Sequence, residues 1–242
     1  YAGIRVEFIT NVFAGEIPLF YLSYPVTVLW IIGITNAVNL IDGLDGLAAG
    51  VSAIAAVTIG IVSVLEGFSQ AGMLAFILAA CVFGFLKYNF HPARIFMGDT
   101  GSLFLGFNLS ALAVLGLTKT TTVMISLFLP VIILGIPIID TLWAIVRRYF
   151  NGKPIFSPDK EHLHHRLLAL GLTHRKTVLV IYGVSALLGA SAIVMTQVTT
   201  PQGMLIMIAV ILGVYIAADK VGVLRSKRLD GREKKACQHI AK

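Results

Sequence analysis

Seven runs of apolar residues constrain the fold of this chain more than any other feature. They lie at about 25–41, 47–65, 71–88, 101–117, 122–146, 177–197 and 203–221. Each approaches the roughly 20 residues that a membrane-spanning helix needs, and such a helix satisfies its own backbone hydrogen bonds within hydrocarbon. With 57% hydrophobic and only 13% charged residues, the chain is unlike a soluble domain. We predict an all-α, polytopic transmembrane helix bundle of about seven spans.

The 242 residues are interpreted as a single membrane domain, 1–242. Residues 1–24 mix aromatic, apolar and charged side chains, which indicates an exposed or interfacial segment. Residues 222–242 are strongly basic and predict a solvated cytoplasmic tail. Because the sequence begins with Tyr1 rather than Met and shows no signal peptide, we expect it to be the C-terminal part of a longer, N-terminally truncated protein.

The basic residues predict how the bundle is oriented. When the runs are threaded alternately, 17 of the 19 Lys and Arg residues fall on one side, leaving Arg5 and Lys119 for the other. The positive-inside rule makes the basic side the cytoplasm. That side also carries the segments 36–46, 89–102 and 150–176. The net charge of +7 is then explained by the membrane orientation and by attraction of the basic residues to anionic lipid. It requires no nucleic-acid partner.

The first polar motif, at 36–46, places Asn36, Asn39, Asp42 and Asp45 three residues apart between two apolar runs. On a helix such residues would be neighbours and form a polar stripe around the axis. Carboxylates at this depth are costly unless they pair, bind a cation or face water. The glycines of the motif leave its surface open to a ligand or another backbone. A plain interfacial turn is the alternative.

The second motif, Asn89 to Ser102, contains Asp99 between two glycines, just before an apolar run. A carboxylate there could hold Mg²⁺, which takes one or two carboxylates together with phosphate oxygens and water. Backbone N–H groups at the start of the next helix could bind an anion. Phe96 could stack on a flat ring or serve as an interfacial anchor, and Asp99 could also cap the helix.

The third motif, Pro154 to Arg166, has three histidines in four residues: His162, His164 and His165. Zinc is one interpretation, but no Cys partner and no H-E-x-x-H spacing is nearby. The basic flanks favour contact with phosphate or sugar oxygens, and a solvated loop is the alternative. Asp140 lies within an apolar run, either as a functional acid or as a helix-end carboxylate beside Arg147 and Arg148. His91 and His174 carry little signal alone.

Together these motifs resemble the polyprenyl-phosphate N-acetylhexosamine-1-phosphate transferases of glycosyltransferase family 4. Within them the sequence is similar to the bacterial undecaprenyl-phosphate N-acetylglucosaminyl 1-phosphate transferase branch, which starts teichoic acid, lipopolysaccharide O-antigen or related cell-wall glycopolymers. The resemblance rests on NAVNLIDGLDGLAAG (36–50), FMGDTGSLFLG (96–106), PIIDTLWAIVRR (137–148) and FSPDKEHLHHRLL (156–168). It implies transfer of GlcNAc 1-phosphate from UDP-GlcNAc to undecaprenyl phosphate with release of UMP, at the cytoplasmic face of the bacterial plasma membrane, with Mg²⁺ or Mn²⁺ as cofactor.

The resemblance also implies roles for residues. Asp99 is similar to the metal ligand, and Asp42, Asp45 and Asp99 resemble catalytic or substrate-positioning groups. The residues that resemble substrate contacts, to the nucleotide, the uracil ring, the sugar or the diphosphate, are Asn36, Asn39, Asn89, Phe96, His162, His164, His165 and Arg166. The family also carries an adjacent Asp-Asp pair and about ten or eleven spans. This sequence has no Asp-Asp, so we expect the chain alone to be inactive.

Other functions remain open at this stage. The phospho-MurNAc-pentapeptide transferases share the chemistry, but FSPDKEHLHH is more similar to the GlcNAc branch. An ion-coupled transporter would use intramembrane acids such as Asp140, although its site would lie near mid-membrane. A non-catalytic membrane partner is a third alternative. The sequence leaves the exact sugar, the downstream polymer, a homodimer, and a one-step or two-step transfer undecided.

Overall fold

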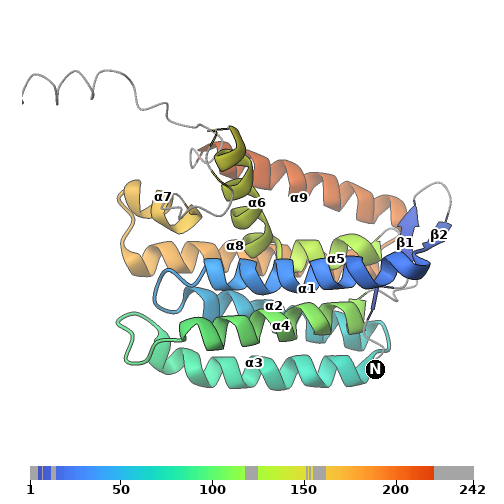
Figure 1. Cartoon of the computed structure of the whole chain (residues 1–242), viewed down its shortest axis with the longest axis horizontal. Coiled ribbons are helices and arrows are strands. Elements are labelled where there is room, and N and C mark those ends of the chain that lie inside the picture. Colours follow the sequence, from blue (N-terminus) through green and yellow to red (C-terminus); the bar gives the residue numbers. More distant parts are fainter. Residues whose placement is uncertain are drawn as a thin grey trace, which may run out of the picture.

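The computed structural model describes residues 5–6, 8–11, 15–117, 125–150, 152, 154 and 162–220. The elements in these ranges are β1 (Phe8–Asn11), β2 (Gly15–Pro18), the 3₁₀ helix η1 (Phe20–Leu22), α1 (Ser23–Leu40), α2 (Leu47–Leu65), α3 (Ser69–Asn89), α4 (Gly98–Leu117), α5 (Ile125–Ile133), α6 (Gly135–Phe150), α7 (Leu163–Ala169), α8 (His174–Gln197) and α9 (Thr200–Lys220). The all-α prediction is confirmed. The N-terminal segment adds one short antiparallel hairpin, β1–β2, beside the start of α1 (Figure 1).

Small residues allow the helices of the bundle to pack closely. Most of α2 is buried, and its sequence is rich in Ala, Gly and Ser. A Cβ added at Gly60 of α2 would lie 2.8 Å from the ring of Phe76 on α3. A Cβ at Gly106 of α4 would lie 2.6 Å from the Cα of Thr35 on α1. Such close backbone approach is how helices associate in lipid, where no hydrophobic force drives them together.

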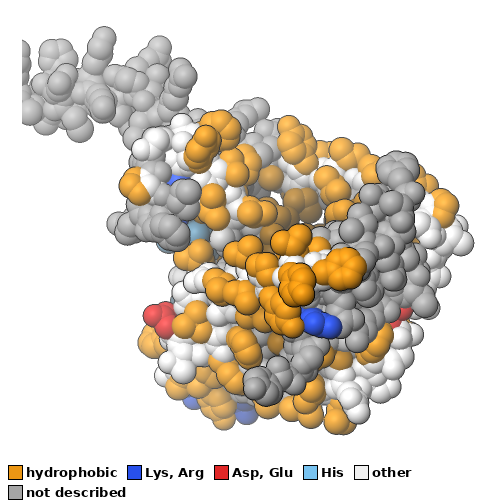
Figure 2. Space-filling view, turned by 45° about the vertical axis from the view of Figure 1, so that its right-hand side comes forward, with side chains coloured by type: hydrophobic (Ala, Val, Ile, Leu, Met, Phe, Trp, Pro, Cys, Tyr) orange, Lys and Arg blue, Asp and Glu red, His pale blue; other side chains and the backbone are white. Residues whose placement is uncertain are grey.

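The outer faces are apolar, as a membrane protein requires. Figure 2 shows hydrophobic side chains over much of the face that it presents. Large exposed residues include Leu29 and Ile32 on α1, and Leu205, Ile208 and Leu212 on α9. An apolar surface of this extent is far larger than a soluble monomer exposes. The chain is a multi-pass membrane protein.

The prediction of about seven spans differs from the structure in one detail. The described residues contain six helices long and apolar enough to cross a membrane. The fifth predicted run, 122–146, is divided into α5 and α6 at Leu134. Pro137 has no N–H to donate to the helix and so interrupts the hydrogen-bond ladder there. Between α4 and α8 the chain still passes from one end of the bundle to the other, with α6 standing across the direction of the long helices (Figure 1).

The alternation of the helices brings the polar motifs to one end of the bundle. The end of α1 with the start of α2, the end of α3 with the start of α4, and α7 with the start of α8 all lie at the left of Figure 1. The hairpin and the start of α9 lie at the opposite end. The predicted basic tail, 222–242, lies outside the described residues, as do residues 155–161 of the third motif.

Candidate active site at one end of the bundle

The first motif is half helix and half turn. Asn36 and Asn39 lie on α1, which ends at Leu40, and the chain turns through 41–46 before α2 begins. The prediction of one continuous helical stripe is therefore wrong beyond Leu40. The turn is closed by a hydrogen bond from the N–H of Asp42 to the carbonyl of Asn39, 3.2 Å, and by Gly46 in the left-handed conformation (φ 79°) that favours glycine. The turn directs the two aspartates to different neighbours.

Asn39, Asp42 and Asp99 form what we call the acidic cluster. The Nδ2 of Asn39 donates to Oδ1 of Asp99 at 3.1 Å and to Oγ of Ser102 at 2.8 Å, joining α1 to the start of α4. Burial, and then the nearby charge of Asp99, raise the pKa of Asp42 above its ordinary value. A divalent cation bound between two such carboxylates would neutralise their charges and remove the repulsion between them. The oxygen donors of Asp42 and Asp99 fit Mg²⁺ or Mn²⁺.

His164 brings the third motif against the first. A Cβ added at Gly43 would lie 2.5 Å from Nε2 of His164, so the imidazole lies directly over this glycine. His164 is buried, and among the described residues no donor or acceptor reaches its Nε2. Burial, with a smaller contribution from the charge of His165, lowers the pKa of His164 to about 4. The ring is therefore neutral at physiological pH and can offer one nitrogen to a ligand beside the turn.

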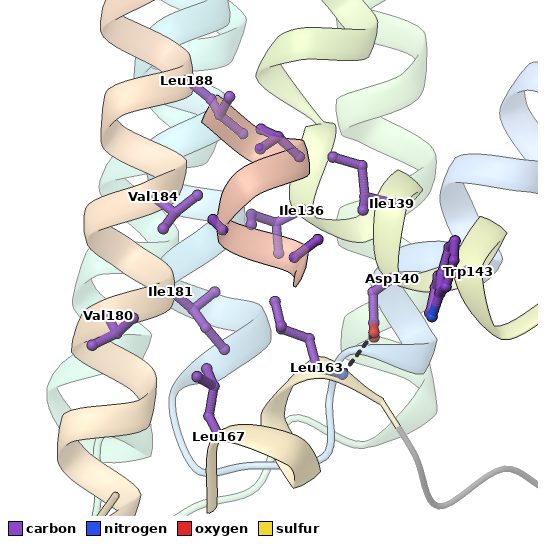
Figure 3. Close-up of a pocket in the computed structure, with 13 residues that line it drawn as sticks. Ile136, Ile139, Asp140, Trp143, Leu163, Leu167, Val180, Ile181, Val184 and Leu188 are labelled. Carbon is purple, nitrogen blue, oxygen red and sulfur yellow. Dashed lines mark hydrogen bonds between the residues drawn. The ribbon is translucent and has the colours of Figure 1, made fainter. Parts of the chain in front are cut away.

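A buried carboxylate positions the histidine motif. The Nδ1–H of His162 donates to Oδ2 of Asp140 at 2.9 Å, and the N–H of Leu163 donates to Oδ1 at 2.8 Å (the second bond is drawn in Figure 3). The rings of His162 and His164 are parallel, with centroids 5.9 Å apart. Asp140 on α6 thus fixes the start of α7. The sequence had offered Asp140 as a functional acid or as a helix-end carboxylate beside Arg147 and Arg148, and did not relate it to His162, 22 positions further along the chain.

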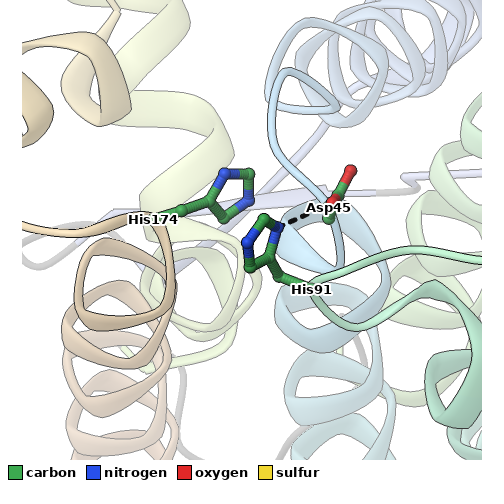
Figure 4. Close-up of side chains that lie close together, drawn as sticks. All are labelled: Asp45, His91 and His174. Carbon is green, nitrogen blue, oxygen red and sulfur yellow. Dashed lines mark hydrogen bonds and ion pairs between the residues drawn. The ribbon is translucent and has the colours of Figure 1, made fainter.

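A second group gathers on the other side of the turn, and we call it the histidine cluster: Asp45, His91 and His174. The Nδ1–H of His91 donates to Oδ2 of Asp45 at 2.9 Å, and the N–H of Ala93 donates to the same oxygen at 3.2 Å. The rings of His91 and His174 stack with centroids 4.1 Å apart (Figure 4). Partial burial raises the pKa of Asp45, but these hydrogen bonds and the charge of His174 outweigh it, so the pKa lies below its ordinary value.

The other predicted site residues are distributed around these clusters. Asn89 is buried; its Oδ1 accepts from the N–H of Gly46 at 3.1 Å and its Nδ2 donates to the carbonyl of Ile95 at 2.9 Å. Phe96 is 79% exposed on the loop before α4, where a ring could stack on it. Asn36 donates to the carbonyl of Ile32 within α1. His165 is exposed and Arg166 is half-buried on α7. Their predicted substrate contacts stay predictions.

An apolar pocket lies beside Asp140. Its walls come from α6, α7, α8 and α9, and its volume is about 160 Å³. Figure 3 shows apolar side chains such as Ile139, Val184 and Leu188 around it, with Asp140 close to Leu163 at one end. The pocket is also lined by Leu163 and Leu167 of α7, the helix that carries His164.

Sequence reasoning missed His91, His174 and Tyr182. His91 and His174 were set aside as isolated, although both lie on the predicted cytoplasmic side with the motifs. The hydroxyl of Tyr182 donates to the carbonyl of Gly46, and its ring occupies the space that a Cβ at Gly50 would need. Nothing in the sequence relates Tyr182 to a glycine 136 residues away.

The fold and these clusters define a multi-pass membrane protein with an acidic, histidine-rich site at one end of its helices. Residues 1–117 match the family model described as glycosyl transferase family 4. The chain is 49% identical over 226 residues to the probable undecaprenyl-phosphate N-acetylglucosaminyl 1-phosphate transferase of Bacillus subtilis (strain 168), covering 93% of this chain and 63% of that protein.

More distant relatives extend the same class. The decaprenyl-phosphate N-acetylglucosaminephosphotransferase of Mycobacterium leprae (strain TN) is 42% identical over 139 residues, which are 52% of this chain and 35% of that protein. The phospho-N-acetylmuramoyl-pentapeptide-transferase of Staphylococcus saprophyticus is 35% identical over 191 residues, 77% of this chain and 55% of that protein. The chain thus spans less than two thirds of the length of each of these relatives.

Proposed function

We propose that the full-length protein is a phosphotransferase that moves GlcNAc 1-phosphate from UDP-GlcNAc to undecaprenyl phosphate and releases UMP. The reaction would take place at the cytoplasmic face and start a cell-envelope glycopolymer. The observation that carries this proposal is the meeting of three distant motifs: Asp99 lies beside Asn39 and Asp42, and His164 lies over Gly43. The N-acetylglucosaminyl transferases among the relatives support the choice of sugar.

The residues present suit in-line phosphoryl transfer, which depends mainly on positioning and charge neutralisation. Asp99, with Asp42 beside it, would hold Mg²⁺ or Mn²⁺, and that ion would neutralise charge developing on the diphosphate. Asn39 keeps Asp99 in place through its Nδ2 hydrogen bond. Neutral His164 would contact a sugar or diphosphate oxygen without placing a second positive charge there. Phe96 would stack on the uracil ring.

The acceptor lipid and the membrane orientation complete the proposal. The apolar pocket between α6 and α9 would receive the first isoprene units of the lipid, because its walls are hydrocarbon and it ends near Asp140 and the histidine motif. The cytoplasmic orientation is supported by the basic residues, 17 of 19 on the side that carries the motifs. The proposed partners are therefore a UDP-sugar and a polyprenyl phosphate.

The test is an assay of UMP release by the full-length protein purified in detergent with Mg²⁺ and undecaprenyl phosphate. UDP-GlcNAc should give lipid-dependent UMP, and UDP-MurNAc-pentapeptide should give little. The reverse preference would move the protein to peptidoglycan synthesis. Solute uptake into liposomes without UMP release would favour the transporter, and the absence of both activities would contradict the proposal.

A further inference from the structure

The histidine cluster has the composition of a metal site that differs from the acidic cluster. Asp45, His91 and His174 each offer one ligand atom, and these atoms lie within 4.8 Å of one another. Figure 4 shows the two imidazole rings stacked on each other, with the carboxylate of Asp45 hydrogen-bonded to His91. The three residues come from the turn 41–46, from the loop after α3, and from the start of α8.

The donor types indicate which cation would bind. Imidazole nitrogens suit zinc and similar transition metals, whereas Mg²⁺ prefers oxygen ligands throughout. Two imidazoles and a carboxylate with the fourth position left for water form a common zinc environment. We propose that the histidine cluster binds one Zn²⁺ ion and thereby ties together the three segments that border the candidate active site.

His174 supports this proposal over a simple hydrogen-bonded pair. Its Nε2 is buried, and in the part of the chain that the structure describes it has no hydrogen-bond partner. A buried polar atom without a partner destabilises the fold, and a metal ion would satisfy it. One divalent cation would take the place of the hydrogen bond between His91 and Asp45.

Binding requires one imidazole to turn out of the stack, because a metal ligand lies in the plane of its ring and the two ring planes are now only 18° apart. Ligand atoms around tetrahedral Zn²⁺ are about 3.4 Å apart, given bonds of about 2.0–2.1 Å. The nitrogen of His91 and the oxygen of Asp45 are 2.9 Å apart, and the whole set fits within 4.8 Å. The guanidinium of Arg175, which follows His174, donates to the backbone carbonyl of His91 at 3.2 Å. That contact holds the loop after α3 against α8.

The experiment measures Zn²⁺ binding to the full-length protein in detergent, by competition with a chromophoric chelator after metal removal. We expect one tight equivalent, with affinity reduced at least about tenfold in both His91→Gln and His174→Gln, since even residues that only support a ligand cost 10–100-fold. His165→Gln removes one exposed imidazole of the neighbouring motif and should leave the affinity unchanged. A double variant, Cys237→Ser with His239→Gln, controls for binding by the tail.

Two further readouts make the outcome decisive. Co²⁺ in the site should give weak ligand-field bands without a thiolate charge-transfer band, and these bands should disappear in His174→Gln. Zn²⁺ should raise the melting temperature of wild type but not of His174→Gln, because binding to the folded state stabilises it. Equal affinity in wild type, His91→Gln and His174→Gln, or loss only in the tail variant, would overturn the proposal. It does not depend on the transfer reaction, so failure of the UMP assay would leave it standing.

Discussion

The acidic cluster and the histidine cluster each take one aspartate from the turn 41–46, Asp42 and Asp45. The pKa values of these two carboxylates are shifted in opposite directions. Asp42 faces another acid, and burial together with Asp99 raises its pKa. Asp45 accepts hydrogen bonds from His91 and Ala93, and its pKa is lowered. Among the described residues, Asp42 thus faces a like charge, whereas Asp45 is held by hydrogen-bond donors.

The different surroundings of Asp42 and Asp45 indicate different roles for two aspartates of one sequence motif. A site that leaves charge uncompensated is ready for a cation or a substrate, and such perturbed groups gather at functional sites. A carboxylate already held by several donors instead fixes the loop that carries it. We therefore propose that the repeated Asp-Gly combines one carboxylate that acts on a cation or substrate, Asp42, with one that holds its loop in place, Asp45.

The largest expected effect comes from the acidic cluster. Asp99→Asn in the full-length protein should reduce UMP release at least about a hundredfold, the scale of one strong electrostatic contact in a transition state. The amide keeps the shape of the side chain but removes its charge. The rate would be measured at saturating UDP-GlcNAc, with thermal melting to verify folding. Turnover near that of wild type would remove Asp99 from the proposed metal site.

A smaller effect should follow when the histidine motif is moved away from the turn. Gly43→Ala would place a Cβ 2.5 Å from Nε2 of His164, so the imidazole must shift. Displacement of a catalytic group by about 1 Å costs up to about a hundredfold, and we expect about a tenfold loss of kcat/KM. Gly33→Ala is the matched control, because a Cβ at Gly33 of α1 meets nothing within 4 Å. Equal activity of the two variants would show that His164 makes no contribution.

The sequence predicted much of this arrangement, and its failures have physical causes. Hydropathy located the membrane helices to within a few residues, because lipid requires long apolar segments. It could not divide α5 from α6, since proline often remains inside transmembrane helices. Spacing identified Asp42 and Asp45 together, but only the turn after Leu40 sends them to different partners. His91 and His174 are separated by 83 positions in the sequence, so only their common membrane side indicated that they might meet.

A third prediction concerns the support that α8 gives to the turn. Tyr182→Phe keeps the ring beside Gly50 and removes the hydroxyl that donates to the carbonyl of Gly46. Loss of one such hydrogen bond should lower the free energy of unfolding by about 1 kcal/mol, or the melting temperature by about 2–4 °C in a protein of this size. Tyr215→Phe on α9 removes a hydroxyl from an exposed residue and should have no effect. The same melting temperature for both variants would argue against this support.

The smallest effect is the most direct test of the contrast between the two carboxylates. A raised pKa means that folding favours the protonated form, so the contribution of Asp42 to stability is present below pH 3.8 and is lost as pH rises through its folded pKa. A lowered pKa has the opposite consequence: Asp45 stabilises the fold above pH 3.8, and this stability is lost as pH falls through its folded pKa.

With divalent cations removed by a chelator, Asp42→Asn should therefore melt at a slightly higher temperature than wild type at pH 7, whereas Asp45→Asn should melt lower. Addition of Mg²⁺ should remove the advantage of Asp42→Asn, because the cation stabilises the ionised carboxylate only in wild type. The measurement is the melting temperature of each full-length variant at pH 7 with and without Mg²⁺. Shifts of the same sign for both variants would show that the two aspartates occupy equivalent electrostatic environments, and the division of the motif into two clusters would then fail.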